Sequence, residues 1–149
     1  DGFAVANYLK KNEKDVFKIL TQTYVKFKDT DYTQNAIRIL HSPIITLTKD
    51  NDYNDIRFSM AAMGAVDVDP KKMKKFYDAY QYFASLLQNK KFKIDFRLEA
   101  GDIFCFNNRR VLHGRTEFDP NSGNRHLQGY YIERDEIIGR LNYFNNIKV

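Results

Sequence analysis

The chain has 149 residues, of which 43% are hydrophobic and 29% charged, a composition that excludes the disordered, collagenous and membrane-spanning classes. It is long enough to bury one core, and its single cysteine excludes an intramolecular disulfide framework. The formal net charge is +5, but the lysines lie in separate short groups and no nucleic-acid-binding signature accompanies them. We therefore expect no nucleic-acid partner and no membrane partner.

The first half of the chain predicts helices followed by strands. Residues 3–21 carry apolar side chains at near-helical spacing, interrupted by a polar run at 11–14, which predicts two short helices. Residues 24–60 hold short β-prone runs separated by turn residues, which predicts three or four strands. Asp69-Pro70 is typical of a helix start, and the aromatic stripe that follows it, from Met73 to Leu87, predicts a helix packed on the core.

The second half predicts further strands and a last helix. Residues 92–98, 102–106 and about 126–132 have strand patterns, and Cys105 is expected to be an inert core residue within the second of them. The closing segment spaces its apolar residues as an amphipathic helix does, with Ile137, Ile138, Leu141 and Phe144. Because strands do not alternate with helices, the fold class is α+β with a mainly antiparallel sheet or barrel.

Three histidines are the first candidates for chemistry. His41 lies beside a turn, with no charged residue placed to orient it, and is expected at the surface. His113 ends a strand pattern beside a glycine and amid three arginines. From the residues alone, His113 remains either a structural residue or a metal ligand or base.

Two motifs resemble a known family. Residues 101–115 read GDIFCFNNRRVLHGR, and residues 125–131 read RHLQGYY, followed by Arg134-Asp135. Taken in this order, they closely resemble the C-terminal part of the γ-butyrobetaine dioxygenases. These are iron(II) and 2-oxoglutarate oxygenases related to trimethyllysine dioxygenase and, more distantly, to taurine dioxygenase. Weaker similarity reaches back to Asp1, so the resemblance covers essentially the whole chain.

The resemblance implies a double-stranded β-helix, or jelly roll, with flanking helices. It also implies iron held by two histidines and one carboxylate, with His113 as the distal histidine. The other two ligands come from an His-x-Asp motif upstream, and this chain has none. We therefore expect residues 1–149 to be the C-terminal part of the catalytic domain, with an incomplete jelly roll and no turnover by the isolated fragment.

The resemblance also assigns roles to residues after His113. Arg125 matches the arginine that binds the far carboxylate of 2-oxoglutarate, and Arg115 is the second candidate for that contact. If a strand carries Arg125 inward, then Tyr131 shares its face and His126 points away. Tyr131 is expected in an aromatic cage for a trimethylammonium group, the alternative being a core tyrosine. Arg110, with its neighbour Asn108, is expected to hold the loop before His113.

The function implied is hydroxylation of γ-butyrobetaine to L-carnitine with Fe(II) and 2-oxoglutarate, and ascorbate is a further candidate cofactor. Residues 56–62 carry Ser, Met and Ala where the family places asparagines near the substrate, which leaves the exact substrate open. The alternatives are trimethyllysine dioxygenase and a non-enzymatic β-barrel binding module lacking iron. The family suggests a homodimer; we expect a cytoplasmic location and leave mitochondria open.

Overall fold

The computed structural model describes residues 1–33, 35–66, 68–117, 119, 121, 123 and 126–145. The chain divides into two compact units, Asp1–Gly114 and Arg115–Val149. The first unit holds three helices and five strands among its described residues, and the second holds one helix. This content confirms the α+β class with small antiparallel sheets.

Two short helices open the chain, as predicted. Helix α1 (Gly2–Asn12) is capped by the Asp1 side chain, which accepts hydrogen bonds from the backbone nitrogens of Phe3 and Ala4. Its buried positions recur at helical spacing: Gly2, Val5, Ala6 and Leu9. Helix α2 (Lys14–Gln22) follows after one residue and buries Leu20. One apolar face of each helix therefore contributes to the core.

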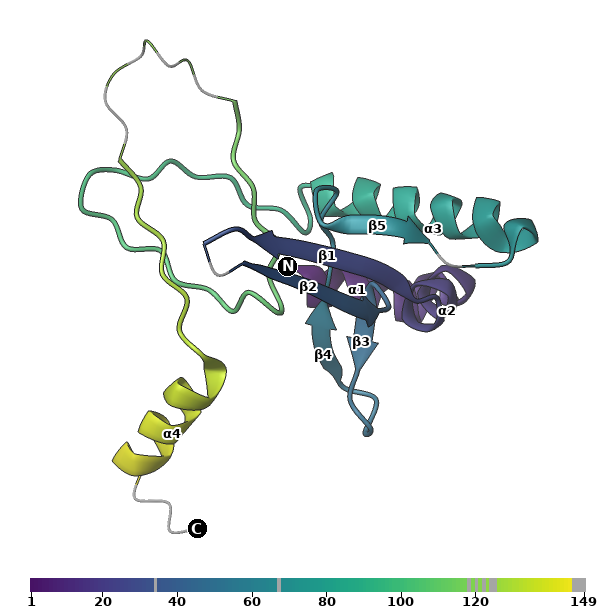
Figure 1. Cartoon of the computed structure of the whole chain (residues 1–149), viewed down its shortest axis with the longest axis horizontal. Helices are drawn as coiled ribbons and strands as arrows, with labels where there is room; N and C mark the ends of the chain where they lie inside the picture. Colours follow the sequence, from purple (N-terminus) through teal and green to yellow (C-terminus); the bar gives the residue numbers. More distant parts are fainter. Residues whose placement is uncertain are drawn as a thin grey trace. The chain divides into compact units, whose positions relative to one another are not determined.

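Two antiparallel sheets follow. Strands β1 (Val25–Asp31), β2 (Ala36–Ser42) and β5 (Met63–Val66) form one sheet in the order β2-β1-β5. Strands β3 (Ile45–Leu47) and β4 (Tyr53–Ile56) form a hairpin. The four strands β1 to β4 confirm the prediction for residues 24–60; β5 follows them in sequence and lies beside β1 in the sheet (Figure 1). His41 is exposed on β2, as expected.

Helix α3 (Pro70–Gln88) begins where the sequence predicts it. Asp69 is its N-cap and accepts a hydrogen bond from the Lys71 nitrogen at 2.9 Å, while Pro70 occupies the first turn. The buried residues confirm that the stripe faces the core, since Phe76 and Phe83 are 1% and 0% exposed. Tyr77 is the exception at 40% exposed.

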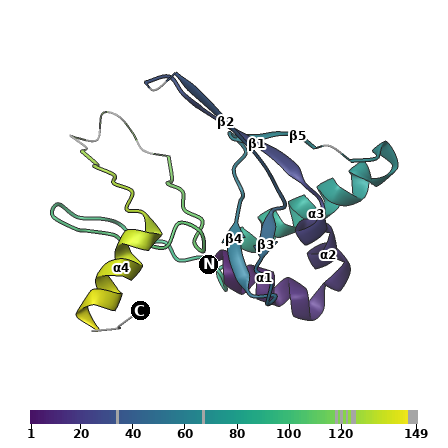
Figure 2. The ribbon, with the colours of Figure 1, turned by 60° about the horizontal axis from the view of Figure 1, so that its bottom comes forward.

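The core of the first unit lies between the helices and the strands. Figure 2 shows α1, α2 and α3 together on one side of the sheet, with the β3–β4 hairpin beside α1. The core draws buried side chains from all of these parts: Val5, Leu9, Leu20, Val25, Ile44, Ile45, Ile56, Val66, Phe76 and Phe83. None of the helices in the described ranges is long and apolar enough to cross a membrane.

The strands predicted at 92–98, 102–106 and 126–132 are wrong for this structure. These residues form no strand, although their sequences are β-prone. A strand is stable only when its backbone hydrogen bonds to a neighbour, and no described residue pairs with these segments in a ladder. Most of their large apolar residues are accordingly exposed, including Ile94 at 79% and Ile103 at 94%.

Cys105 shows the same effect. We expected a core residue, but the thiol is exposed because the segment that carries it packs in no sheet.

In the second unit, helix α4 (Arg134–Phe144) confirms the last predicted helix. It has no buried residue among those described, so its apolar face is unpaired within its own unit.

Candidate active site

His113 lies near the end of the first unit, after a tight turn. Asn107 makes this turn: its carbonyl oxygen accepts hydrogen bonds from the nitrogens of Arg110 and Val111 at 3.0 and 2.9 Å, and its side chain accepts from the nitrogen of Arg109 at 3.0 Å. After the turn, Leu112 is half-buried and packs on the core, whereas His113 is exposed. The His113 imidazole therefore faces solvent, while the preceding residue Leu112 holds the segment on the core.

A row of aromatic rings leads to this imidazole. Phe96 contacts Phe104 and Phe104 contacts Phe106, each pair with ring centroids 5.0 Å apart. Phe106 in turn contacts the ring of His113 at 4.8 Å, tilted by 54°. One side of the imidazole is thus set against an apolar ring, which limits its rotation.

Residues just before His113 are attached to the start of the chain. The guanidinium of Arg110 forms a salt bridge with the Asp1 carboxylate at 2.6 Å. The carbonyl oxygen of Arg110 accepts from the Gly2 nitrogen at 3.0 Å, and that of Arg109 accepts from the Ile56 nitrogen at 2.9 Å. The structure therefore gives Arg110 the loop-holding role expected from the sequence.

The other predicted residues belong to the second unit. Arg115 and His126 are exposed, and Tyr131 is 86% exposed. Tyr131 is therefore not a core tyrosine within its own unit. Arg125 lies outside the described residues. Because residues 126–132 form no strand, the structure does not show the alternating face that was expected to join Arg125 and Tyr131.

Iron needs several ligands, and the described residues do not bring them together. No group of three His, Cys, Asp or Glu side chains in the described ranges is placed to hold a metal ion. The imidazole of His113 is exposed and is of a type that binds metals, so it can supply one ligand to such a site. The described residues therefore do not fit a complete iron site by themselves.

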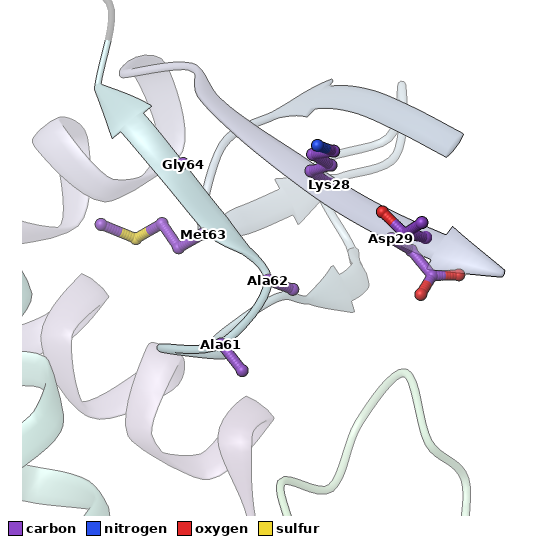
Figure 3. Close-up of a pocket in the computed structure, with 7 residues that line it drawn as sticks. Lys28, Asp29, Ala61, Ala62, Met63 and Gly64 are labelled. Atoms are coloured by element: carbon purple, nitrogen blue, oxygen red, sulfur yellow. The ribbon is translucent and has the colours of Figure 1, made fainter. Parts of the chain in front are cut away.

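A shallow hollow lies elsewhere in the first unit, between β1 and the start of β5 (Figure 3). Its volume is about 430 Å³, and it is lined by Lys28, Asp29, Thr30, Ala61, Ala62, Met63 and Gly64. Part of its wall belongs to residues 56–62, where the sequence departs from the asparagines expected near a substrate. Residues 59–62 form a turn in which the Ala62 nitrogen donates to the Ser59 hydroxyl at 3.3 Å.

Comparison with known proteins defines the class. Residues 1–131 match the family described as taurine catabolism dioxygenase TauD, TfdA family, and the chain belongs to this family. It is 36% identical over 141 residues to the γ-butyrobetaine dioxygenase of Pseudomonas sp. (strain AK-1), which covers 95% of this chain and 36% of that protein. It is 35% identical over 145 residues to the γ-butyrobetaine dioxygenase of Homo sapiens, covering 95% of this chain and 37% of that protein.

A more distant relative is the trimethyllysine dioxygenase of Meyerozyma guilliermondii, 28% identical over 148 residues, covering 97% of this chain and 36% of that protein. The chain thus spans about a third of the length of the curated relatives that it matches. The resemblance inferred from residues 101–131 is confirmed at the level of the family.

Sequence reasoning missed Asp1. It assigned this residue no structural role, whereas the carboxylate both caps α1 and pairs with Arg110. An acidic residue directly before a helix is a signal for the cap. No sequence signal identifies the ion pair, because its partners are 109 residues apart.

Proposed function

We propose that the chain is the C-terminal part of the catalytic domain of an iron(II)- and 2-oxoglutarate-dependent dioxygenase that hydroxylates γ-butyrobetaine to L-carnitine. The observation that carries this proposal is the 36% identity over 95% of the chain to a protein named γ-butyrobetaine dioxygenase. The exposed imidazole of His113, held on an anchored segment, supports it from the structure.

In this proposal, His113 is one iron ligand, and the remaining ligands come from sequence before residue 1. Bound iron would supply the activation of oxygen. The 2-oxoglutarate co-substrate carries a second carboxylate, for which a guanidinium is the best partner because it donates two parallel hydrogen bonds. We assign this contact to Arg125, with Arg115 as the second candidate.

We also propose that the full-length fold is a double-stranded β-helix. The β-prone segments at 92–98 and 102–106 would then become strands by pairing with parts of the protein beyond this chain. Their exposed apolar side chains support this: Ile94 and Ile103 are 79% and 94% exposed, and Phe96 and Phe104, which contact each other, are still 55% and 47% exposed. A cytoplasmic homodimer is the expected state of the whole protein.

Tyr131 is proposed to contribute to an aromatic cage for the trimethylammonium group. A quaternary ammonium has no N–H donor, so ring faces and shape must select it, each face contributing about 0.5–2 kcal/mol. In the full-length enzyme, Tyr131→Phe should leave affinity for γ-butyrobetaine nearly unchanged, while Tyr131→Leu should weaken it selectively. Calorimetric titration of substrate and of 2-oxoglutarate checks this, and equal weakening of both ligands would remove Tyr131 from the cage.

The function itself is tested by turnover in the full-length protein. Purified enzyme with Fe(II) and 2-oxoglutarate should form succinate and L-carnitine when γ-butyrobetaine is added, and much less product with trimethyllysine. Preference for trimethyllysine would favour the alternative hydroxylase, which the more distant relatives represent. Absence of metal and 2-oxoglutarate binding would favour the binding module.

A further inference from the structure

We propose that the ion pair between Asp1 and Arg110 positions His113: it fixes residues 109–113 against the first turn of α1 and thereby sets the direction of the imidazole. The inference deepens the proposed function and rests on it, since it names two residues that act on the proposed metal ligand without touching the metal. Asp1 and Arg110 are thus positioning residues rather than catalytic residues.

The contact between Arg110 and Asp1 is a bidentate fork: two guanidinium nitrogens donate to the two carboxylate oxygens. Arg110 Nη2 donates to Asp1 Oδ2 at 2.6 Å, and Arg110 Nε donates to Oδ1 and Oδ2 at 3.2 and 3.1 Å. The guanidinium also lies 6.0 Å from the centre of the Phe3 ring. A planar guanidinium engaged in this way fixes an orientation as well as a distance, which an ammonium group cannot do.

The backbone approaches closely at the same place. The Gly2 nitrogen donates to the Arg110 carbonyl oxygen, and a Cβ atom at residue 2 would lie 2.9 Å from that oxygen and 3.1 Å from Ile56 Cγ1. Glycine at residue 2 therefore allows the two backbone segments, at Gly2 and at Arg110, to approach this closely. The fork and this backbone contact hold Arg110 from both its side chain and its main chain.

The path from Arg110 to His113 is short and anchored. Val111 and Leu112 are both half-buried, and Leu112 packs on the core. On the other side, Phe106 holds the imidazole ring at 4.8 Å. Because only Val111 and Leu112 separate Arg110 from His113, loss of the contact between Arg110 and Asp1 should be transmitted to the imidazole.

The cap on α1 offers a way to separate two roles of Asp1. Its Oδ1 accepts from the nitrogens of Phe3 and Ala4 at 3.1 and 3.2 Å, in addition to the contact with Arg110. Asparagine caps a helix about as well as aspartate does, but it is neutral and cannot accept the fork with both atoms. Asp1→Asn thus removes the charged fork and keeps the cap, whereas Asp1→Ala removes both.

The experiment uses the full-length protein and four variants: Asp1→Asn, Arg110→Gln, Arg110→Lys and the exposed neighbour Arg109→Gln as the matched control. Hydrogen exchange of residues 107–114 and binding of Mn²⁺ alone, followed by electron paramagnetic resonance, are measured for each. We expect Asp1→Asn and Arg110→Gln each to accelerate this exchange about tenfold and to weaken Mn²⁺ binding about tenfold, while exchange in α1 is unchanged. Arg110→Lys should restore part of both, and Arg109→Gln should match the wild type.

The outcomes separate the positioning role from a structural one. Unchanged exchange in residues 107–114 would overturn the inference, and so would faster exchange with unchanged Mn²⁺ affinity, because the ion pair would then act on the loop alone. If the double variant of Asp1→Asn and Arg110→Gln is no weaker than either single variant, the two residues act as one contact, as proposed. A wild-type protein that binds no Mn²⁺ would contradict the proposed function, and exchange alone would then decide whether the pair holds the loop.

Discussion

Replacing Phe83 with alanine should lower the free energy of unfolding by about 3–5 kcal/mol. The side chain is 0% exposed in the middle of α3, and its ring lies 5.5 Å from that of Phe58. Alanine would leave a cavity between the helix and the strands that rigid neighbours cannot fill. Urea unfolding, followed by the helical circular dichroism signal of the full-length protein, measures the loss.

The control for Phe83 lies on the same helix. Gln81 is exposed, so Gln81→Ala should change the free energy of unfolding by no more than about 0.5 kcal/mol. A loss below about 1 kcal/mol for Phe83→Ala would contradict the position of this residue in the core.

Replacing Arg125 with alanine in the full-length enzyme should weaken 2-oxoglutarate binding by about 2–3 kcal/mol, or roughly 30- to 150-fold. The expected loss is large because the proposed bidentate hydrogen bonds to the far carboxylate of 2-oxoglutarate would be removed, while the proposed metal ligands would stay in place. Mn²⁺ affinity should therefore change much less. Calorimetric titration of 2-oxoglutarate into the metal-loaded protein provides the measurement.

Arg115→Ala is the companion variant. Because Arg115 is the second candidate, its replacement should weaken 2-oxoglutarate less than that of Arg125 does. The reverse order of the two effects would transfer the anion contact to Arg115. Equal and small effects would show that neither guanidinium binds the far carboxylate.

The helices were predictable because their signals are local. Asp69, Pro70 and the stripe that includes Phe76 and Phe83 specify the start and the buried face of α3 within about fifteen residues. Strands were predicted at 92–98 and 102–106 because Ile94 and Ile103 lie in strongly β-prone runs, but the structure has no strand there. A strand depends on a partner that its own sequence does not contain.

The candidate site likewise has one part that its sequence predicts and another that depends on contacts between distant residues. His113 could be chosen from its motif and is exposed, and its role as an iron ligand stays a prediction. The contact between Asp1 and Arg110 could not be predicted, because it exists only after α1 and the turn at Asn107 have folded onto the same core. The roles of Arg125 and Tyr131 stay predictions.

Strand β2 has a consequence for the behaviour of the protein in solution. Within the described residues it pairs only with β1, so the backbone groups along its outer edge are open. Ile37 and Ile39 are 63% and 56% exposed on it, with Arg38 between them. In a protein made of residues 1–149 alone, an open edge with such side chains would be a template for intermolecular pairing, and aggregation at high protein concentration would begin at this strand.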